Sequence, residues 1–376
     1  AYEMLRSLVG SKMCISDRPT GPRDQVAPVV GQAVAERHRW REGGEGVALL
    51  VEATTGASAL LVAYSGTRGA LEAWWKYLVL TTFGLAVAML GIIVLYVAIA
   101  PNGGARGALE WQSIERAAPR LGDGPAVVAF GLIVAGLATK VGWAPVHNWL
   151  PDAHSEAPPA VSALLSAALL PTVVLVVWRV LTTLGPALAP GTASALVLAF
   201  GLVSLAVAVP FLWRSMAWKR LLAYSSLEHM GVLAIGIGFA TPLATAGVIV
   251  HVAGHALAKS LGFYAAGPML RHAARAHERA VRGLAFANPP TATAAGVSIG
   301  ALAAMPPSPL FVSELLILLG GITAGETAVT IVAALLLALG FLVIAHALID
   351  VLVGEPRVKR WRSARSARRA PALDTG

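Results

Sequence analysis

The sequence predicts an all-α, polytopic transmembrane bundle of about nine helices, and three observations carry this prediction. The 376 residues are 56% hydrophobic and only 13% charged, whereas a soluble domain is about a quarter charged. Apolar runs of about 20 residues, long enough to cross a bilayer, recur along most of the chain. The alternating polar and apolar pattern of a membrane barrel does not occur, and helices satisfy their own backbone polar groups in lipid.

Nine apolar segments give the predicted spans in order. They run over 47–64, 75–100, 125–150, 159–184, 189–213, 221–240, 243–267, 291–321 and 327–353. The third contains Pro145, and the eighth contains Pro306 and Pro307. Because proline removes a backbone donor and clashes with the preceding turn, we predict broken helices near 145 and 306–309. Such breaks are tolerated at membrane depth where they line an enclosed, hydrated cavity.

The two ends of the chain differ from the 47–356 transmembrane domain. Residues 1–46 are basic and rich in Arg, Gly and Pro. They contain neither a spanning run nor the apolar core of a signal peptide. We expect this segment to be disordered or non-native. Residues 357–376 form a basic tail.

Lysine and arginine in the connecting loops predict which side faces the cytoplasm. If the spans alternate, one side of the membrane holds Arg68, Lys76, Arg214, Lys219, Arg220, Arg271, Arg275, Arg279, Arg282 and the tail. The positive-inside rule makes this side cytoplasmic, in what we expect to be a bacterial inner membrane. Two segments disagree, because the 101–124 loop contains arginines beside acids and the basic 1–46 segment falls on the opposite side.

Composition also excludes several classes of function. A single cysteine, Cys14, permits neither a disulfide framework nor a paired-cysteine metal motif. The net charge of +9 comes from residues between and after apolar runs, so topology explains it better than nucleic-acid binding. No nucleophile elbow or phosphate-binding loop occurs. We therefore expect no catalytic chemistry and no cofactor on this chain.

Two charged residues within the spans are candidates for proton transfer, since charge at membrane depth is rare and usually functional. Lys140 lies roughly 15 Å from the nearer end of its span, beyond comfortable snorkelling. A misplaced span end would instead make it an interfacial lysine. Glu52 lies near the start of the first span, beside Thr54 and Thr55. It suits either a proton-accepting site or a helix start, where the dipole favours an acid.

A second group of candidates occupies the seventh and eighth spans. His251, His255 and Lys259 in HVAGHALAKS recur every four residues and therefore share one helix face. They form a titratable ladder about 12 Å long, and histidine titrates in the physiological range. Structural hydrogen bonding is one alternative and a metal site another, but no third metal ligand is evident and we predict no metal. Glu314 follows the second predicted break.

The segment KVGWAPVHNWLPDAHSEAPPAVSALL at 140–165 resembles the signature of proton-translocating, antiporter-like membrane subunits. That family includes large membrane subunits of complex I, Mrp-type cation/proton antiporters and the membrane arms of group 4 NiFe hydrogenases. Further blocks match in order: KRLLAYSSLEHMG, HALAKSLGFYAAG and PPSPLFVSELLIL. SSLEHMG, VEATTGASALLVAY and the late GEP are most similar to hydrogenase-4 component F and its relatives. The resemblance covers about 47–356.

This resemblance implies a family core of about fourteen helices with two inverted five-helix repeats, each containing one broken helix. The first span here then corresponds to the family's fifth helix, so the chain is a partial version of the fold. Glu52 and Lys140 correspond to an ion pair between the fifth and seventh helices. The other matching relay positions are His251, His255, Lys259 and Glu314.

The matched motifs contain further titratable residues, which are secondary candidates: His147, Asp152, His154, Glu228 and His229. One departure from the family pattern matters. Many relatives carry a lysine on the eighth helix where this chain has Pro171. Its loss puts a continuous lateral proton route in doubt.

The resemblance implies a proton-translocating membrane subunit of a respiratory-type oxidoreductase complex, of the hydrogenase-4/formate hydrogenlyase or NADH-quinone oxidoreductase kind. Protons would cross through a Glu/Lys/His relay. Other membrane subunits and a peripheral redox arm would be the partners, and the electron chemistry would take place there. Two alternatives remain: a Mrp-type Na⁺/H⁺ antiporter subunit, and a non-conducting membrane anchor for a peripheral oxidoreductase arm.

Overall fold

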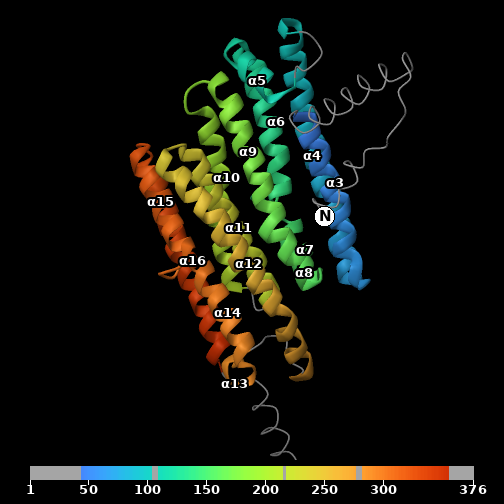
Figure 1. Cartoon of the computed structure of the whole chain (residues 1–376), viewed down its shortest axis with the longest axis vertical. Helices are drawn as coiled ribbons and strands as arrows, with labels where there is room; N and C mark the ends of the chain where they lie inside the picture. The colour runs from blue at the N-terminus through green and yellow to red at the C-terminus, as the bar shows by residue number, and fades with distance from the viewer. Residues whose placement is uncertain (1–43, 104–108, 215–216, 277–281, 355–376) are drawn as a thin grey trace, which may run out of the picture.

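A computed structural model of the chain describes residues 44–103, 109–214, 217–276 and 282–354, and within them nearly every residue is helical (Figure 1). The predicted basic tail at 357–376 lies outside these residues, as does almost all of the predicted 1–46 segment. The helices run along one common direction, with α3 and α4 at one side of the bundle and α16 at the other (Figure 1).

The helices of the first half are α3 (Gly44–Val62), α4 (Arg68–Gly103), α5 (Trp111–Ala117), α6 (Asp123–Val141), α7 (Trp149–Glu156), α8 (Pro159–Leu164) and α9 (Leu170–Leu184). A π-helical turn, Leu165–Leu169, joins α8 to α9. The helices of the second half are α10 (Thr192–Arg214), α11 (Trp218–Phe239), α12 (Pro242–Ala276), α13 (Leu284–Ala287), α14 (Pro289–Leu302), α15 (Pro309–Thr323) and α16 (Thr327–Val353).

Seven segments of the described chain are long and apolar enough to cross a membrane: 68–99, 124–141, 159–187, 192–214, 218–239, 242–271 and 327–353. Each overlaps one predicted span. The two other predicted spans also fall on helices. The 47–64 span lies on α3, and the 291–321 span is divided between α14 and α15. The expected helical bundle is therefore confirmed.

Both predicted helix breaks are present. The first broken helix begins as α6, which ends at Val141. There Gly142 adopts the left-handed conformation, at φ 78°, that favours glycine. The chain then passes Pro145 and resumes as α7. The second break separates α14 from α15 and contains Pro306 and Pro307. There the Ser308 side chain caps the new helix by accepting from the Phe311 N–H at 3.2 Å.

The centre of the bundle is α11, which packs against α10, α12, α15, α9 and α7. Nearly all of its side chains are buried. Its crossing with α10 is close, since a Cβ added to Gly201 would lie 2.9 Å from the Gly231 carbonyl oxygen. Small residues at such crossings let transmembrane helices approach. Both broken helices send their second half, α7 or α15, against this central helix.

Candidate functional site

Lys140 lies in the last turn of α6, directly before the first break, and its side chain is fully buried. Its ammonium donates to the Thr55 hydroxyl of α3 at 2.8 Å and to the Tyr77 hydroxyl of α4 at 2.7 Å. The Ser58 hydroxyl lies 2.7 Å from the same Tyr77 oxygen. The predicted intramembrane lysine is therefore held by a cage of neutral hydroxyls from two other helices.

Aromatic rings fix this cage in position. The Tyr77 ring stacks on Trp149, the first residue of α7, with centroids 4.5 Å apart. The Trp149 indole N–H donates to the Thr139 carbonyl at 2.6 Å. Lys140 Nζ also lies 4.8 Å from the Tyr77 ring centroid, within cation–π range. The break thus returns the chain so that a residue after it supports the lysine before it.

Glu52 is not in an ion pair with Lys140 in this structure. Among the described residues no carboxylate lies within 4.0 Å of the Lys140 ammonium, so the expected Glu52–Lys140 ion pair is not formed in this structure. The half-buried Glu52 instead accepts from the Thr82 hydroxyl at 3.3 Å. It lines an otherwise apolar cavity of about 280 Å³ between α4, α5, α6 and α9. The reason is local: Thr55, one turn further along α3, occupies the position facing the lysine.

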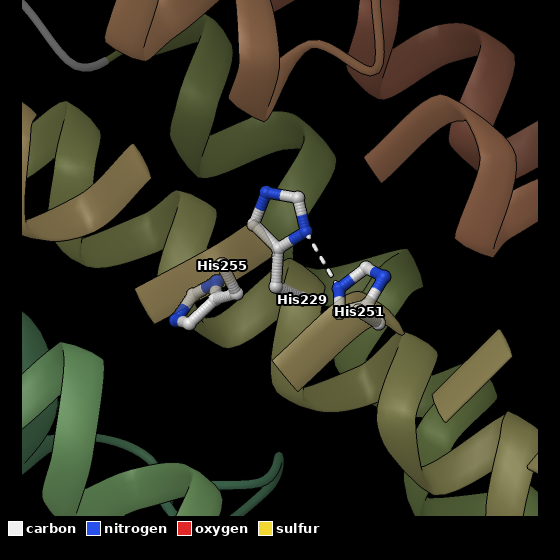
Figure 2. A group of neighbouring side chains, drawn as sticks. All are labelled: His229, His251 and His255. Atoms are coloured by element: carbon white, nitrogen blue, oxygen red, sulfur yellow. Dashed lines mark hydrogen bonds between the residues drawn. The ribbon is translucent and has the colours of Figure 1, made fainter. Parts of the chain in front are cut away.

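Three histidines from α11 and α12 lie close together. His229 of α11 and His251 and His255 of α12 are at most 1% exposed. His229 Nδ1 lies 3.1 Å from His251 Nε2 (Figure 2). One ring nitrogen from each histidine lies within 4.8 Å of those of the other two. Both His255 nitrogens and His229 Nε2 have no hydrogen-bond partner among the described residues.

The hydrogen bonds of this cluster have a direction. The Ser313 hydroxyl donates to the Leu310 carbonyl at 2.8 Å and lies 2.8 Å from His251 Nδ1. With its proton committed, Ser313 accepts from His251 Nδ1–H, which leaves His251 Nε2 to accept from His229 Nδ1–H. The opposite direction would require the Ser313 hydroxyl to rotate from the Leu310 carbonyl to His251 Nδ1, so that His251 Nε2–H donates to His229 Nδ1.

Lys259 lies one turn after His255 and is also fully buried. Its ammonium donates to the Leu222 carbonyl at 2.6 Å and to the Ser225 hydroxyl, both on α11. Nearby, Ser226 Oγ lies 2.8 Å from Ser166 Oγ in the π-helical turn. π-Turns often occur at functional sites because they redirect side chains.

Two acids lie beyond the histidines. Glu228 is 3% exposed, and its Oε2 has no hydrogen-bond partner among the described residues. Its carboxylate packs on Gly340 of α16, where an added Cβ would lie 1.9 Å from Oε1. Glu228 interacts electrostatically with Lys259 and with Glu314, the partly buried acid of α15. The second break therefore places Glu314 near enough to α11 to interact with Glu228.

The remaining secondary candidates are dispersed. Asp152 forms ion pairs with Lys76 at 3.1 Å and Arg220 at 2.9 Å, in a partly exposed network. His147 lies inside the first break, 6.4 Å from the Phe211 ring. His154, on α7 between two spanning segments, stacks on Phe263. Burial, with Lys259 and Lys219 adding smaller effects, lowers the pKa of His154 to about 3, so it is neutral at pH 7.

Sequence reasoning missed two features of these sites. His229 was only a secondary candidate, although it completes the histidine cluster, because nothing along the chain shows that α11 faces the ladder of α12. Tyr77 was not a candidate at all. It follows Lys76 at the predicted start of a span and was indistinguishable from an interfacial aromatic residue. The polar pattern Thr55-x-x-Ser58, on one face of α3, was the available signal.

Comparison with known proteins places these residues in a family context. Residues 47–343 match the family model described as NADH:quinone oxidoreductase/Mrp antiporter, transmembrane. The chain is 33% identical over 309 residues to a hydrogenase-4 component F homolog from Methylacidiphilum infernorum, covering 82% of this chain and 64% of that protein. It is 30% identical over 305 residues to NADH-quinone oxidoreductase subunit N from Desulforudis audaxviator, covering 78% and 58%.

Solved structures share the fold. A chain of the Mrp complex from Dietzia sp. superposes with a TM-score of 0.73 at 22% identity, over 84% of this chain and 58% of that one. A chain of respiratory complex I from Thermus thermophilus gives 0.72 at 22% identity, over 84% and 65%. The sequence therefore spans less than two thirds of each of these relatives.

Proposed function

Because the chain is a multi-pass membrane protein that belongs to the NADH:quinone oxidoreductase/Mrp antiporter transmembrane family, we propose that it is a proton-translocating subunit of a respiratory-type oxidoreductase complex. The observation that carries this proposal is the burial of Lys140, His229, His251, His255 and Lys259 inside the bundle, each on a helix that crosses it. Isolated charges at this depth are costly, and such residues mark ion and proton pathways.

Lys140 is proposed to hold a proton whose release depends on Glu52. In the structure its ammonium contacts only neutral oxygens of Thr55 and Tyr77 among the hydrogen bonds described. An approach of Glu52 would stabilise the charge, and its withdrawal would favour release. Breaking a buried ion pair costs about 3–5 kcal/mol, whereas moving one charge against 100 mV takes about 2.3 kcal/mol. Opening and closing of this pair is therefore sufficient in magnitude.

The histidine cluster is proposed to pass the proton onward. His229 and His251 already share a hydrogen bond, and Ser313 anchors its far end. Glu228 and Glu314, which interact electrostatically with each other, are the proposed acceptors. Where many relatives carry a lysine and this chain has Pro171, the Ser166–Ser226 pair is the proposed link between the halves. Water between the groups would complete the path.

The electron chemistry is proposed to take place in partner subunits, including a peripheral redox arm, with no redox cofactor on this chain. The location is proposed to be a bacterial inner membrane, with the basic loops and carboxyl-terminal tail on the cytoplasmic side. The Mrp-type antiporter role is the second candidate, favoured by the similarity of fold to the Mrp complex. Sodium dependence of proton flux separates the two.

The direct test replaces Lys140 with methionine in the assembled complex and measures proton uptake together with electron transfer in sealed vesicles. We expect proton uptake per electron to be lost while uncoupled electron transfer continues. Lys76→Gln is the control, because Lys76 lies in the partly exposed Glu72 and Asp152 network. Normal proton uptake in Lys140→Met would reject the proposal.

A further inference from the structure

His229, His251 and His255 form the one group of three or more possible metal ligands within the described residues. They come from two adjacent helices and are at most 1% exposed. Neutral imidazole is a preferred ligand of Zn²⁺, and three histidines with one open position make a known type of zinc site. We propose that these three histidines bind a divalent transition-metal ion, with Zn²⁺ as the best match.

The spacing of the donor atoms fits this use. Three nitrogens bound tetrahedrally at 2.0–2.1 Å would lie about 3.4 Å from one another. The His229–His251 pair is at 3.1 Å, and the group as a whole lies within 4.8 Å. Metal binding would therefore require the imidazoles to move by about 1 Å toward the spacing of 3.4 Å. Figure 2 shows His229 between His255 and His251, with its ring joined to that of His251 by the hydrogen bond.

The unused nitrogens supply a second, independent observation. Both ring nitrogens of His255 are buried without a hydrogen bond of normal geometry among the described residues. An unpartnered buried polar atom costs about 1–3 kcal/mol. His255 can therefore offer its lone pair to a metal ion, whereas binding through His229 Nδ1 and His251 Nε2 would displace the proton that these two nitrogens share. His154 also has two unpartnered nitrogens, but it belongs to no such group of ligands, so it is the matched control.

Ser313 gives the site an outer contact of the kind that metal sites use. Metal-binding histidines commonly donate their second ring N–H to a protein oxygen, which fixes the ring and its tautomer. His251 Nδ1 makes this contact with Ser313 Oγ at 2.8 Å, leaving Nε2 directed into the cluster. His251 is therefore preorganised as a ligand through Nε2.

The surrounding charges moderate the site. Lys259, one turn beyond His255, interacts electrostatically with His229 and His255 and opposes a dication. This opposing charge is expected to make metal binding reversible rather than that of a permanent structural centre.

Occupation of the site would have a consequence that rests on the proposed function. A metal ion takes the nitrogens that the proposed proton relay uses, so binding would stop relay through His229 and His251. Binding itself does not depend on proton translocation. The two claims therefore have separate readouts.

The binding test uses the full chain in lipid nanodiscs, purified with a tag that contains no histidine. Zn²⁺ retained after gel filtration is measured by elemental analysis, and Co²⁺ is added separately as a visible-absorbance probe. We expect saturable binding in the wild type and a loss of affinity greater than about tenfold in His255→Gln, since even outer partners of metal ligands contribute 10–100-fold. His154→Gln is expected to bind as the wild type does.

Three outcomes would overturn the metal site. The first is that the His229→Gln/His251→Gln/His255→Gln variant retains as much Zn²⁺ as the wild type. The second is that His154→Gln loses as much Zn²⁺ affinity as His255→Gln. The third uses the wild type alone and does not depend on whether a variant folds: X-ray absorption of the Zn²⁺-loaded protein would show oxygen ligands without imidazole.

Proton uptake in the assembled complex, measured with and without Zn²⁺, then separates the claims. Inhibition of the wild type over the Zn²⁺ concentrations that fill the site supports both the site and the relay. Zn²⁺ binding confirmed by X-ray absorption without inhibition supports the site and rejects the relay. Loss of proton uptake in the histidine variants, with no Zn²⁺ bound by the wild type, rejects the site and leaves the relay standing.

Discussion

Two regions of the molecule have the same order of elements but different chemistry. In the first, α3 and α4 precede the broken pair α6/α7, and in the second, α11 and α12 precede the broken pair α14/α15. The first buries Lys140 among hydroxyls and two histidines that do not meet, His147 and His154. The second buries three histidines that meet, two lysines and an acid. This difference suits the proposed roles, in which the first region holds a charge and the second passes it on.

The two regions also differ in whether their polar residues precede or follow the helix break. Lys140 precedes the first break, whereas Ser313 and Glu314 follow the second. If the regions have these distinct roles, substitutions in the second should stop transfer, and substitutions around Lys140 should weaken its hold on the proton.

The largest expected effect is that of His251→Gln, which removes the histidine between His229 and Ser313. Proton uptake per electron in sealed vesicles should fall at least about 100-fold, the lower range for loss of a general acid–base group. His154→Gln controls for loss of a buried histidine elsewhere. A drop of only a few fold would mean that the second region does not conduct.

Tyr77→Phe tests the first region and keeps the ring that stacks on Trp149. It removes one hydroxyl from the Lys140 ammonium, and a hydrogen bond to a charged group contributes about 1.5–3 kcal/mol. Proton uptake should fall about 10–100-fold. Tyr64→Phe, at an 81% exposed residue, is the control. Equal rates in Tyr77→Phe and wild type would show that the hydroxyl cage is dispensable.

Ser313→Ala has a smaller expected effect because it removes a neutral acceptor from His251. Such bonds contribute about 0.5–1.5 kcal/mol, so proton uptake should fall about 2–10-fold. The tautomer of His251, read by nitrogen NMR of labelled protein, should lose its preference for Nδ1–H. A tautomer unchanged in the variant would contradict the proposed direction of the chain.

The last prediction concerns stability rather than proton uptake, at His154, which follows the first break yet interacts with Lys259 of the second region. Burial lowers its pKa from 6.5 to about 3, so only the unfolded chain binds the proton between these values. Stability is therefore full above pH 6.5 and falls as the pH drops towards 3. Between pH 7 and 5 the loss is about 2 kcal/mol. In His154→Gln the fall in Tm between pH 7 and 5 should be smaller than in the wild type. An identical fall would show that the burial of His154 is not its cause.

Hydropathy predicted the bundle and proline predicted both breaks, because lipid leaves the backbone few alternatives to a helix. The sequence also identifies Lys140, His251, His255 and Lys259 as candidate site residues, since polar residues stand out within apolar runs. The partners of these residues were harder to predict. Whether Glu52 or Thr55 faces Lys140 depends on the rotation of α3, and whether His229 faces α12 depends on the packing of α11. Neither rotation nor packing is encoded in periodicity when most of a helix is buried.

The burial of α11 has a consequence for how the protein is made. Its most apolar window has a mean hydropathy of only 1.3, against 2.6 for α4 and 2.8 for α16. Glu228 and His229 lie at the middle of α11, and a charged residue such as Asp or Lys at the centre of a helix costs about 2.5–3.5 kcal/mol on the scale for insertion by the translocon. This helix is therefore expected to leave the translocon together with α10 or α12. The polar groups proposed to move protons would then also set the order of membrane insertion.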